Sequence, residues 1–460
     1  MICRRKCQTR KQNSAKHGSK TLPNAEVKTI LLLREKAVMK QKYLSRIADK
    51  VLNSALEASG AVLIEGPKWC GKTRTAEEKA ASALYMQDPD HTASYMQTAD
   101  IKPSLLLQGD TPRLIDEWQM APVLWDAIRF AVDQRGETRQ FILTGSAVPK
   151  DNAIQHTGTG RISRMVMRPM SLFESLESNG KISLKSLFDG TVKEKSGHSS
   201  LTIERLAFAL IRGGWPASVG QNESAALKQV YDYVDAVINI DVSRVDGIEK
   251  SPARLRALMR SLARNVSTTA SITTIHRDIA ADEDTISEKT ISSYINALRR
   301  IFVIEDLPAW NPAMRSKTAL RVAPKRHFVD PSIAAAVFRA NSKSLLQDFN
   351  TFGLLFESLC IRDLRVYAQA IDGEVFHYRD KSGFEADAIV HLKDGRWGAV
   401  EVKMGAKEIE KAAENLKILR EKINLDKMKE PSFLMVLTAT ELGYRRNDGV
   451  YIIPIGCLRD

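Results

Sequence analysis

Eight consecutive residues carry the clearest chemical pattern in the sequence: Gly66, Pro67, Lys68, Trp69, Cys70, Gly71, Lys72 and Thr73. Their spacing, G-x-x-x-x-G-K-T, is that of a phosphate-binding loop, in which glycines let several backbone N–H groups turn toward an anion. Lys72 would neutralise the β- and γ-phosphates of ATP, and Thr73 would offer a hydroxyl group to Mg²⁺. A buried strand at 61–64 and a helix at 73–84 are expected on either side. The sequence therefore predicts a site for ATP and Mg²⁺.

Two adjacent carboxylates follow the next buried strand, which is expected at 112–116. Asp116 would hold Mg²⁺ through a water molecule, and Glu117 would orient or polarise the water that attacks the γ-phosphate. The simpler interpretation is that both acids cap a helix expected at 118–134. Because the two acids are adjacent, the pattern favours hydrolysis of ATP over binding alone.

Hydroxyl groups and arginines follow further along the chain. The strand at 140–144 ends in Thr144 and Ser146, which would sense the γ-phosphate, although the pair also fits a plain turn. Arg161 lies just before the next expected strand, and Arg164 is the reserve candidate. A guanidinium group that reaches the γ-phosphate would stabilise the transition state. The alternative is that both arginines only pair with surface acids.

A second group of charged residues lies near the C-terminus. Asp387 and Glu401 fall on two alternating strands, Lys403 follows two residues later, and Glu357 lies on a helix expected at 351–365. An acid followed by E-x-K is the layout of the PD-(D/E)xK nuclease fold, in which Asp387 and Glu401 would bind Mg²⁺ and Lys403 would activate a water molecule. Taken alone, E-x-K on a strand is usually a solvated face. Convergent side chains would favour cleavage, whereas side chains locked in ion pairs would count against it.

The order of elements indicates an α/β fold class. Strands alternate with helices around the phosphate loop, which predicts a parallel sheet. We expect a P-loop ATPase core at 41–200 and a helical lid or connector at 201–250. Helices followed by two short strands predict a winged-helix-like domain at 251–342, and an α/β nuclease-like domain is expected at 343–460.

The positive charge of the chain is concentrated at its start. The net charge is +13, but residues 1–42 hold 12 Lys/Arg and 2 Asp/Glu, whereas the remaining residues hold 56 and 53. Residues 1–40 are expected to be a disordered basic tail. It would be an arm for nucleic acid or be inert, or translation would start at Met39. DNA or RNA is a further candidate partner of the middle block, where helix 288–300 is the best recognition helix. Its arginines are Arg254, Arg256, Arg260, Arg264, Arg299 and Arg300.

Membrane and zinc partners are not expected. No apolar run reaches the roughly 18 residues that a bilayer span needs. The five cysteines lack the paired spacing of a zinc site, and their scarcity favours a reducing cytoplasm as the location.

Taken in order, G-x-x-x-x-G-K-T, L-I-D-E, L-T-G-S, G-R and R-P-M-S-x-x-E resemble the motifs of the AAA+ ATPases. The turn Ile211-Arg-Gly-Gly-Trp-Pro216 and the segment from Pro324-Lys325 to Asp330-Pro331 resemble a group of prokaryotic AAA-type ATPases with a C-terminal domain of uncharacterised role. The resemblance covers roughly residues 42–405. It implies a C-terminal domain similar to the restriction-endonuclease-like fold. It also implies an arginine finger that acts across the interface of a homo-oligomer.

Three functions remain open from the sequence. The first is an ATPase that drives or gates a nuclease-like module on nucleic acid. The second is a nucleotide-dependent switch that binds a protein partner and has an inactive nuclease fold. The third is a simple ATPase whose C-terminal domain only aids assembly.

Overall fold

The computed structural model describes residues 43–146, 158–192, 196–242, 250–280, 287–312, 322–423 and 428–460. The expected tail of residues 1–40 lies outside these ranges. Residues 44–460 group into one unit. Among the described helices, none combines the length and apolar character that a membrane span needs.

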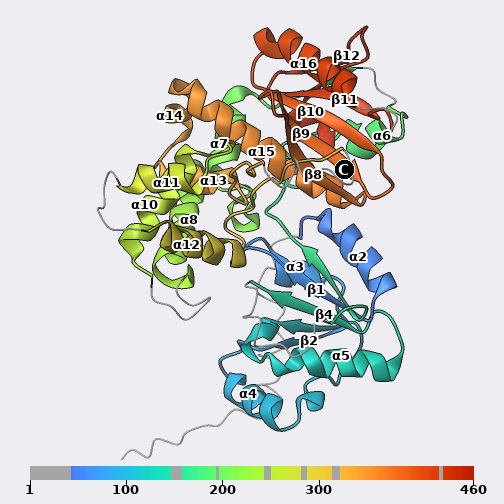
Figure 1. The fold of residues 1–460 in the computed structure, drawn as a ribbon. Helices are drawn as coiled ribbons and strands as arrows, with labels where there is room; N and C mark the ends of the chain where they lie inside the picture. The colour runs from blue at the N-terminus through green and yellow to red at the C-terminus, as the bar shows by residue number, and fades with distance from the viewer. Residues whose placement is uncertain are drawn as a thin grey trace, which may run out of the picture. The chain divides into compact units, whose positions relative to one another are not determined.

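A five-stranded parallel sheet carries the phosphate loop, with the strand order β2-β3-β4-β1-β5. Its strands are β1 (Ala61–Glu65), β2 (Ser82–Tyr85), β3 (Arg113–Asp116), β4 (Phe141–Gly145) and β5 (Ile162–Val166). Helices α2 (Ala48–Ala58) and α3 (Lys72–Glu77) lie on one face and α5 (Val123–Arg135) on the other (Figure 1). Because both faces are covered, alternate residues of β1 enter separate cores, and the strand is a continuous apolar run. The predicted parallel α/β sheet is confirmed.

The helix after the phosphate loop is shorter than predicted. It ends at Glu77, and Ser82–Tyr85 forms strand β2, which pairs in parallel with β3. No glycine or proline separates the two elements, so the sequence reads as one helical run. Sequence reasoning also missed helix α4 (Thr92–Ile101) and the turn η1 (Pro103–Leu105), while the helix expected at 118–134 is split into η2 (Trp118–Met120) and α5.

The middle of the chain is a helical block. Its elements are α7 (Ile203–Arg212), η4 (Pro216–Ser218), α8 (Glu223–Ala236), the π-helical turn η5 (Val237–Asp241), α10 (Pro252–Arg264), α11 (Ile272–Ala280), α12 (Glu288–Arg300), α13 (Pro331–Val337) and α14 (Ser342–Gln347). Between α12 and α13, antiparallel bridges join Ile304 to Phe328 and Leu307 to Lys325. We call residues 304–307 and 325–328 the hairpin. Helices followed by a short hairpin fit the expected winged-helix-like unit, which stays a prediction.

A seven-stranded mixed sheet dominates the C-terminal block, with the order β7-β12-β13-β11-β10-β9-β8. Its strands are β7 (Ser196–His198), β8 (Gly373–Arg379), β9 (Glu385–Leu392), β10 (Trp397–Lys403), β11 (Phe433–Thr438), β12 (Leu442–Arg445) and β13 (Tyr451–Pro454). The long helix α15 (Phe349–Gln369) packs on one face and α16 (Ile409–Lys422) on the other. Short turns η7 (Ala406–Glu408) and η8 (Ile455–Cys457) complete the block.

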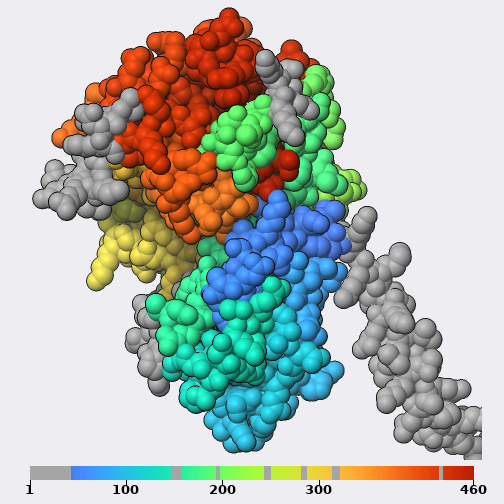
Figure 2. Space-filling view, turned by 90° about the vertical axis from the view of Figure 1, so that its right-hand side faces the viewer, coloured from blue at the N-terminus to red at the C-terminus, as the bar shows by residue number. Residues whose placement is uncertain are grey.

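The chain leaves the ATPase sheet well before residue 200. Strand β7 joins the C-terminal sheet by pairing with β12, and β6 (Ile182–Ser183) pairs with β14 (Leu458–Arg459). The Ser178 hydroxyl donates to the Leu458 carbonyl at 2.7 Å. In Figure 2 the green residues of this segment, which include α6 (Leu184–Phe188), lie against orange and red ones. Residues 178–192 and 196–198, which we assigned to the ATPase core, therefore pack with the C-terminal block.

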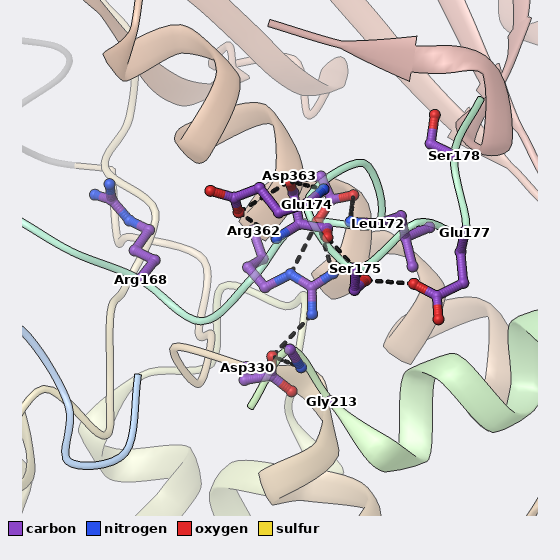
Figure 3. Close-up of polar contacts among 12 residues, drawn as sticks. Arg168, Leu172, Glu174, Ser175, Glu177, Ser178, Gly213, Asp330, Arg362 and Asp363 are labelled. Atoms are coloured by element: carbon purple, nitrogen blue, oxygen red, sulfur yellow. Dashed lines mark hydrogen bonds and ion pairs between the residues drawn. The ribbon is translucent and has the colours of Figure 1, made fainter. Parts of the chain in front are cut away.

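A buried charge cluster connects these parts (Figure 3). Arg362 on α15 contacts Asp330 at 2.8 Å and Asp363 at 2.7 Å, and all three side chains are 2% exposed or less. Asp330 also accepts a hydrogen bond from the Gly214 N–H, and Asp363 accepts one from the Leu172 N–H. The cluster therefore fixes the loop after β5 and the Gly-Gly-Trp-Pro turn to the start of α13 and the middle of α15.

Removal of Arg362 should be costly. Breaking a buried ion pair leaves an uncompensated charge, which costs about 3–5 kcal/mol, so Arg362→Met should lower the free energy of unfolding by that amount. The matched control is Arg256→Met, because Arg256 pairs with Asp235 at an exposed position and such pairs contribute about 0–1 kcal/mol. Urea unfolding followed by circular dichroism measures both. Equal losses in the two variants would contradict this role of the cluster.

Candidate nucleotide site and C-terminal carboxylate cluster

The phosphate loop runs from the carboxyl end of β1 to the start of α3. The ammonium group of Lys72 lies across the loop, donating to the Gly66 carbonyl at 3.0 Å and the Pro67 carbonyl at 2.8 Å. Gly66 has φ +151°, and a Cβ atom there would lie 2.1 Å from the Met167 carbonyl oxygen, so no other residue fits. Gly71 has φ +99° and begins the turn into α3.

Three neighbouring strands bring the predicted polar residues together. Since β4 lies between β1 and β3, their carboxyl ends meet at the same edge of the sheet. The hydroxyl groups of Thr73 and Thr144 both donate to Asp116 Oδ1, at 2.7 and 2.6 Å. The other oxygen, Asp116 Oδ2, is buried and has no hydrogen-bond partner among the described residues. A carboxylate oxygen left free beside a threonine hydroxyl fits the ligand set of Mg²⁺.

Glu117 is held next to this group by an unusual backbone conformation. Its φ of 53° is in the left-handed region, which is uncommon for a residue with a side chain and costs about 1–3 kcal/mol. The Glu117 N–H donates to the Thr144 hydroxyl, and its carboxylate accepts from the Ser146 hydroxyl at 3.2 Å and from the Gln119 amide. The fold therefore turns Glu117 toward the end of β4.

Arg161 does not lie at this site within the same chain. It precedes β5 and its carbonyl accepts from the N–H of Ala61, at the amino end of β1. The phosphate loop leaves the other end of β1, roughly 15–20 Å away at about 3.3 Å per residue. Arg161 instead pairs with Asp133 at 2.7 Å, the surface-acid alternative. Within one chain, Arg161 therefore lies at the opposite edge of the sheet from the phosphate loop, and its action on a γ-phosphate across a subunit interface stays a prediction.

The reserve candidate, Arg164, lies in the middle of β5, opposite Leu63. Its guanidinium group contacts Glu65 at 3.2 Å and stacks over the Trp125 ring. These contacts account for its position without a nucleotide.

The helical block forms one wall of the nucleotide site. Lys68 of the loop contacts Asp241 at 2.5 Å, and the Trp69 ring lies 5.6 Å from that of Tyr233. A cavity of about 460 Å³ lies between the two parts. Its lining residues include Lys68, Glu117 and Ser146 from the sheet side and Tyr233, Val237, Asp241, Ile301 and Val303 from the helical block. A ligand at this site would therefore contact both parts.

Sequence reasoning missed Arg46, which supports the loop from behind. This buried arginine donates to the Cys70 carbonyl at 2.8 Å, to the Arg168 carbonyl at 2.8 Å and to the Glu174 carboxylate at 3.0 Å. Glu174 is the last residue of the R-P-M-S-x-x-E pattern, and it also accepts from the N–H groups of Ile47 and Ser171. Nothing near Arg46 in the sequence marks it as part of the site.

The C-terminal acids converge, but around lysines. Lys403 contacts Asp387 at 3.2 Å and Glu401 at 2.9 Å, which brings these three predicted residues together. Sequence reasoning missed Lys325, whose ammonium group lies 2.8 Å from Glu357 and 3.2 Å from Asp387. The only signal for it was its place in the segment Pro324-Lys325, and nothing in the sequence indicated its partners.

Burial and crowding set the charge of this cluster. Burial, followed by the nearby Asp387 carboxylate, raises the pKa of Glu357 to about 7 and the pKa of Glu401 to about 8. Burial also acts to raise the pKa of Asp387, but the ammonium groups of Lys325 and Lys403 overcome it and lower that pKa to about 2. Asp387 is therefore the ionised centre of the cluster.

This arrangement does not fit the Mg²⁺ site that we predicted for Asp387 and Glu401. Among the described residues, no group of three or more His, Cys, Asp or Glu side chains is arranged to hold a metal ion. The Asp387 oxygens are taken by the two lysines and by the Val402 N–H at 2.9 Å. By the criterion set out from the sequence, side chains locked in ion pairs count against cleavage.

One of the known protein families that match this chain covers the phosphate loop. Residues 58–176 match the model of the AAA domain, and the chain thus carries an AAA-type ATPase core. Residues 203–344 match a domain of unknown function, DUF8612, and residues 352–458 match another, DUF4143.

Two mycobacterial proteins are similar over most of the chain. Uncharacterized protein Rv2008c of Mycobacterium tuberculosis and Uncharacterized protein Mb2031c of Mycobacterium bovis are each 23% identical over 381 residues, which is 82% of this chain and 75% of theirs. Among solved structures, the Walker-type ATPase Paby2304 of Pyrococcus abyssi aligns at 13% identity over 65% of this chain and 97% of its own, with a TM-score of 0.39.

The raised pKa values of two carboxyl groups predict that stability falls between about pH 5 and about pH 8. The folded pKa values of Glu357 and Glu401, about 7 and about 8, exceed the ordinary 4.5. The folded chain therefore binds more protons, and the free energy of unfolding should fall as the pH rises from about 5 to about 8. The lowered pKa of Asp387 acts only below its ordinary 3.8. Urea unfolding at several pH values should show a smaller fall for Glu357→Gln, and an unchanged one for the exposed control Glu374→Gln. An identical pH profile for wild type and Glu357→Gln would exclude this cause.

Proposed function

We propose that this protein is a Mg²⁺-dependent ATPase that works as a nucleotide-dependent switch, in which the helical and C-terminal parts respond to the nucleotide. The observation that carries the proposal is the group formed by Thr73, Asp116 and Thr144 at the edge of the sheet, with Glu117 directed toward Ser146. These residues supply the ligands and the base that the reaction needs.

Each residue of the site has a distinct task. Lys72 would exchange its two carbonyl contacts for phosphate oxygens, because an ammonium group prefers an anion. Thr73 and Asp116 would hold Mg²⁺, which when bound neutralises charge on the phosphates. Glu117 would accept a proton from the attacking water, and Ser146 fixes the direction of its carboxylate.

The response of the other parts is supported by two contacts. Lys68 belongs to the phosphate loop and contacts Asp241 of the helical block, so phosphate oxygens would compete with Asp241 for the same ammonium group. Arg168, in the loop after β5, contacts Glu305 of the hairpin at 2.9 Å. Both contacts would change the free-energy balance between arrangements of the two parts when the nucleotide binds.

Two substitutions test the nucleotide site. Lys72→Ala should weaken ATP binding by about 30-fold or more, since loss of one partner of a buried charge pair costs about 2–5 kcal/mol. Glu117→Gln should keep ATP binding but lower turnover about 10²–10⁴-fold, the usual contribution of a general base. Equilibrium binding of labelled ATP and phosphate release measure the two effects. Lys403→Ala is the control and should leave turnover intact. Unchanged ATP turnover in Glu117→Gln would contradict the assignment of Glu117 as the general base.

A second candidate function is cleavage of nucleic acid by the C-terminal domain. The convergence of Glu357, Asp387, Glu401 and Lys403 favours it, whereas their ion pairs and the absence of a suitable metal-binding group among the described residues count against it. Contact of the middle block with DNA or RNA also stays a prediction. Three of its arginines are already paired with acids: Arg256, Arg264 and Arg299.

Incubation with labelled DNA and RNA distinguishes the two functions. With Mg²⁺ or Mn²⁺, and with or without ATP, the wild type should leave both substrates intact, because the carboxylates are neutralised by lysines. The Lys403→Ala variant, which lacks the lysine of the E-x-K motif, is incubated in parallel as the control. Metal-dependent cleavage by the wild type that is lost in Lys403→Ala would overturn the switch in favour of the ATP-coupled nuclease.

A further inference from the structure

We propose that Lys325 is a resident counter-ion: its ammonium group takes the position of a divalent cation between Glu357 and Asp387, and the cluster accepts a cation only when this lysine is removed. The inference concerns the C-terminal cluster and does not depend on ATP hydrolysis.

The contacts of Lys325 are those of a counter-ion. Its Nζ atom lies 2.8 Å from Glu357 Oε1 and 3.2 Å from Asp387 Oδ1, so a single positive group bridges a helix and a strand. The residue is 3% exposed, although lysine is almost never fully buried unless it is paired. The Lys325 side chain therefore lies among the carboxylates and is not a solvent-facing neighbour.

The backbone fixes Lys325 in this position. Its N–H donates to the Leu307 carbonyl at 3.0 Å, and its carbonyl accepts from the Leu307 N–H at 2.8 Å. The next residue is held as well, because Arg326 contacts Asp306 at 2.7 Å. With the backbone fixed on both sides, only the side-chain rotamers of Lys325 remain to be ordered, at about 1.5–2 kcal/mol, which its two ion pairs must offset.

The charges in the cluster also favour a resident lysine. Three carboxylates, Glu357, Asp387 and Glu401, face two ammonium groups, which leaves at most one excess negative charge. A divalent cation added to both lysines would create an excess positive charge in a buried space, and burial penalises such a charge. Without Lys325, three carboxylates would face Lys403 alone, and a cation would restore the balance.

The distances suit a cation once the lysine is gone. Glu357 Oε1 and Asp387 Oδ1 each lie about one hydrogen-bond length from a common point. Carboxylate ligands surround Ca²⁺ at about 2.3–2.6 Å, and Mn²⁺ prefers the same oxygen donors. Small side-chain movements on α15 and β9 would therefore close the two oxygens onto a metal ion.

Titration with Mn²⁺, followed by the spectrum of free Mn²⁺ in paramagnetic resonance, tests this inference. The variant is Lys325→Met, which keeps an unbranched apolar stem but removes the charge. It should bind one Mn²⁺ at least about tenfold more tightly than the wild type, because the ammonium group that occupies the position of the cation is gone. Lys325→Arg keeps the charge and should behave like the wild type.

The double variant Lys325→Met/Asp387→Asn is the matched control. Any Mn²⁺ that Asp116 holds at the nucleotide site is common to every sample. The additional Mn²⁺ site that Lys325→Met creates should be lost only when Asp387 is also replaced. Lys325→Met that binds no more Mn²⁺ than the wild type would overturn the inference. The inference would also be overturned if the wild type bound a Mn²⁺ ion that Asp387→Asn does not bind. Such binding would mean that the cation enters the cluster while Lys325 is present.

Folding of the variant supplies a further readout. If Lys325→Met does not fold alone, refolding in millimolar Mn²⁺ should recover its circular dichroism and solubility, whereas the double variant Lys325→Met/Asp387→Asn should not be recovered. Equal failure with and without Mn²⁺ would show that the lysine has no cation-like role, and would count against the inference.

Discussion

One buried guanidinium group, that of Arg362, constrains much of this structure. A charge removed from water costs several kcal/mol unless it is paired and hydrogen-bonded, and both Asp330 and Asp363 satisfy this demand. The Asp330 oxygen that binds Arg362 also accepts from the Gly214 N–H, and the other oxygen of Asp363 accepts from the Leu172 N–H. None of these partners can move without leaving a buried polar group unsatisfied. The interaction therefore sets one arrangement of the loop after β5, the helical block and α15.

The same loop leads to the nucleotide. Two residues beyond Leu172, Glu174 binds Arg46, which in turn holds the Cys70 carbonyl of the phosphate loop. In the other direction Arg168 contacts Glu305 of the hairpin that carries Lys325. A chain of contacts transmits a signal only if one of its members has two arrangements that a ligand distinguishes. Under the proposed function, the contacts of Lys72 and Lys68 would be such members, because both ammonium groups rest on oxygens that phosphate would replace.

The sequence predicted the features that are local. The phosphate loop, the acid at the end of β3 and the hydroxyl groups after β4 are each marked by a few adjacent residues, and a parallel sheet must bring the carboxyl ends of its strands together. The short helix α3 was not predictable, since no breaker separates it from β2. Arg161 could have been placed correctly: a residue before a parallel strand lies at the opposite edge from a residue after one. Lys325 could not, because its partners are decided by a hairpin and a helix far apart in the chain.

The C-terminal cluster shows why a motif does not define a site. The acid and E-x-K residues Asp387, Glu401 and Lys403 meet as the motif predicts, and on that count alone a metal would be expected. What decides the chemistry is the total charge within a few ångströms, and one lysine from another segment reverses it. A buried cluster of carboxylates must be neutralised by protons or by some cation. A cation from solvent leaves a site that can be emptied and refilled, whereas a lysine of the chain makes the neutralisation permanent and the cluster structural.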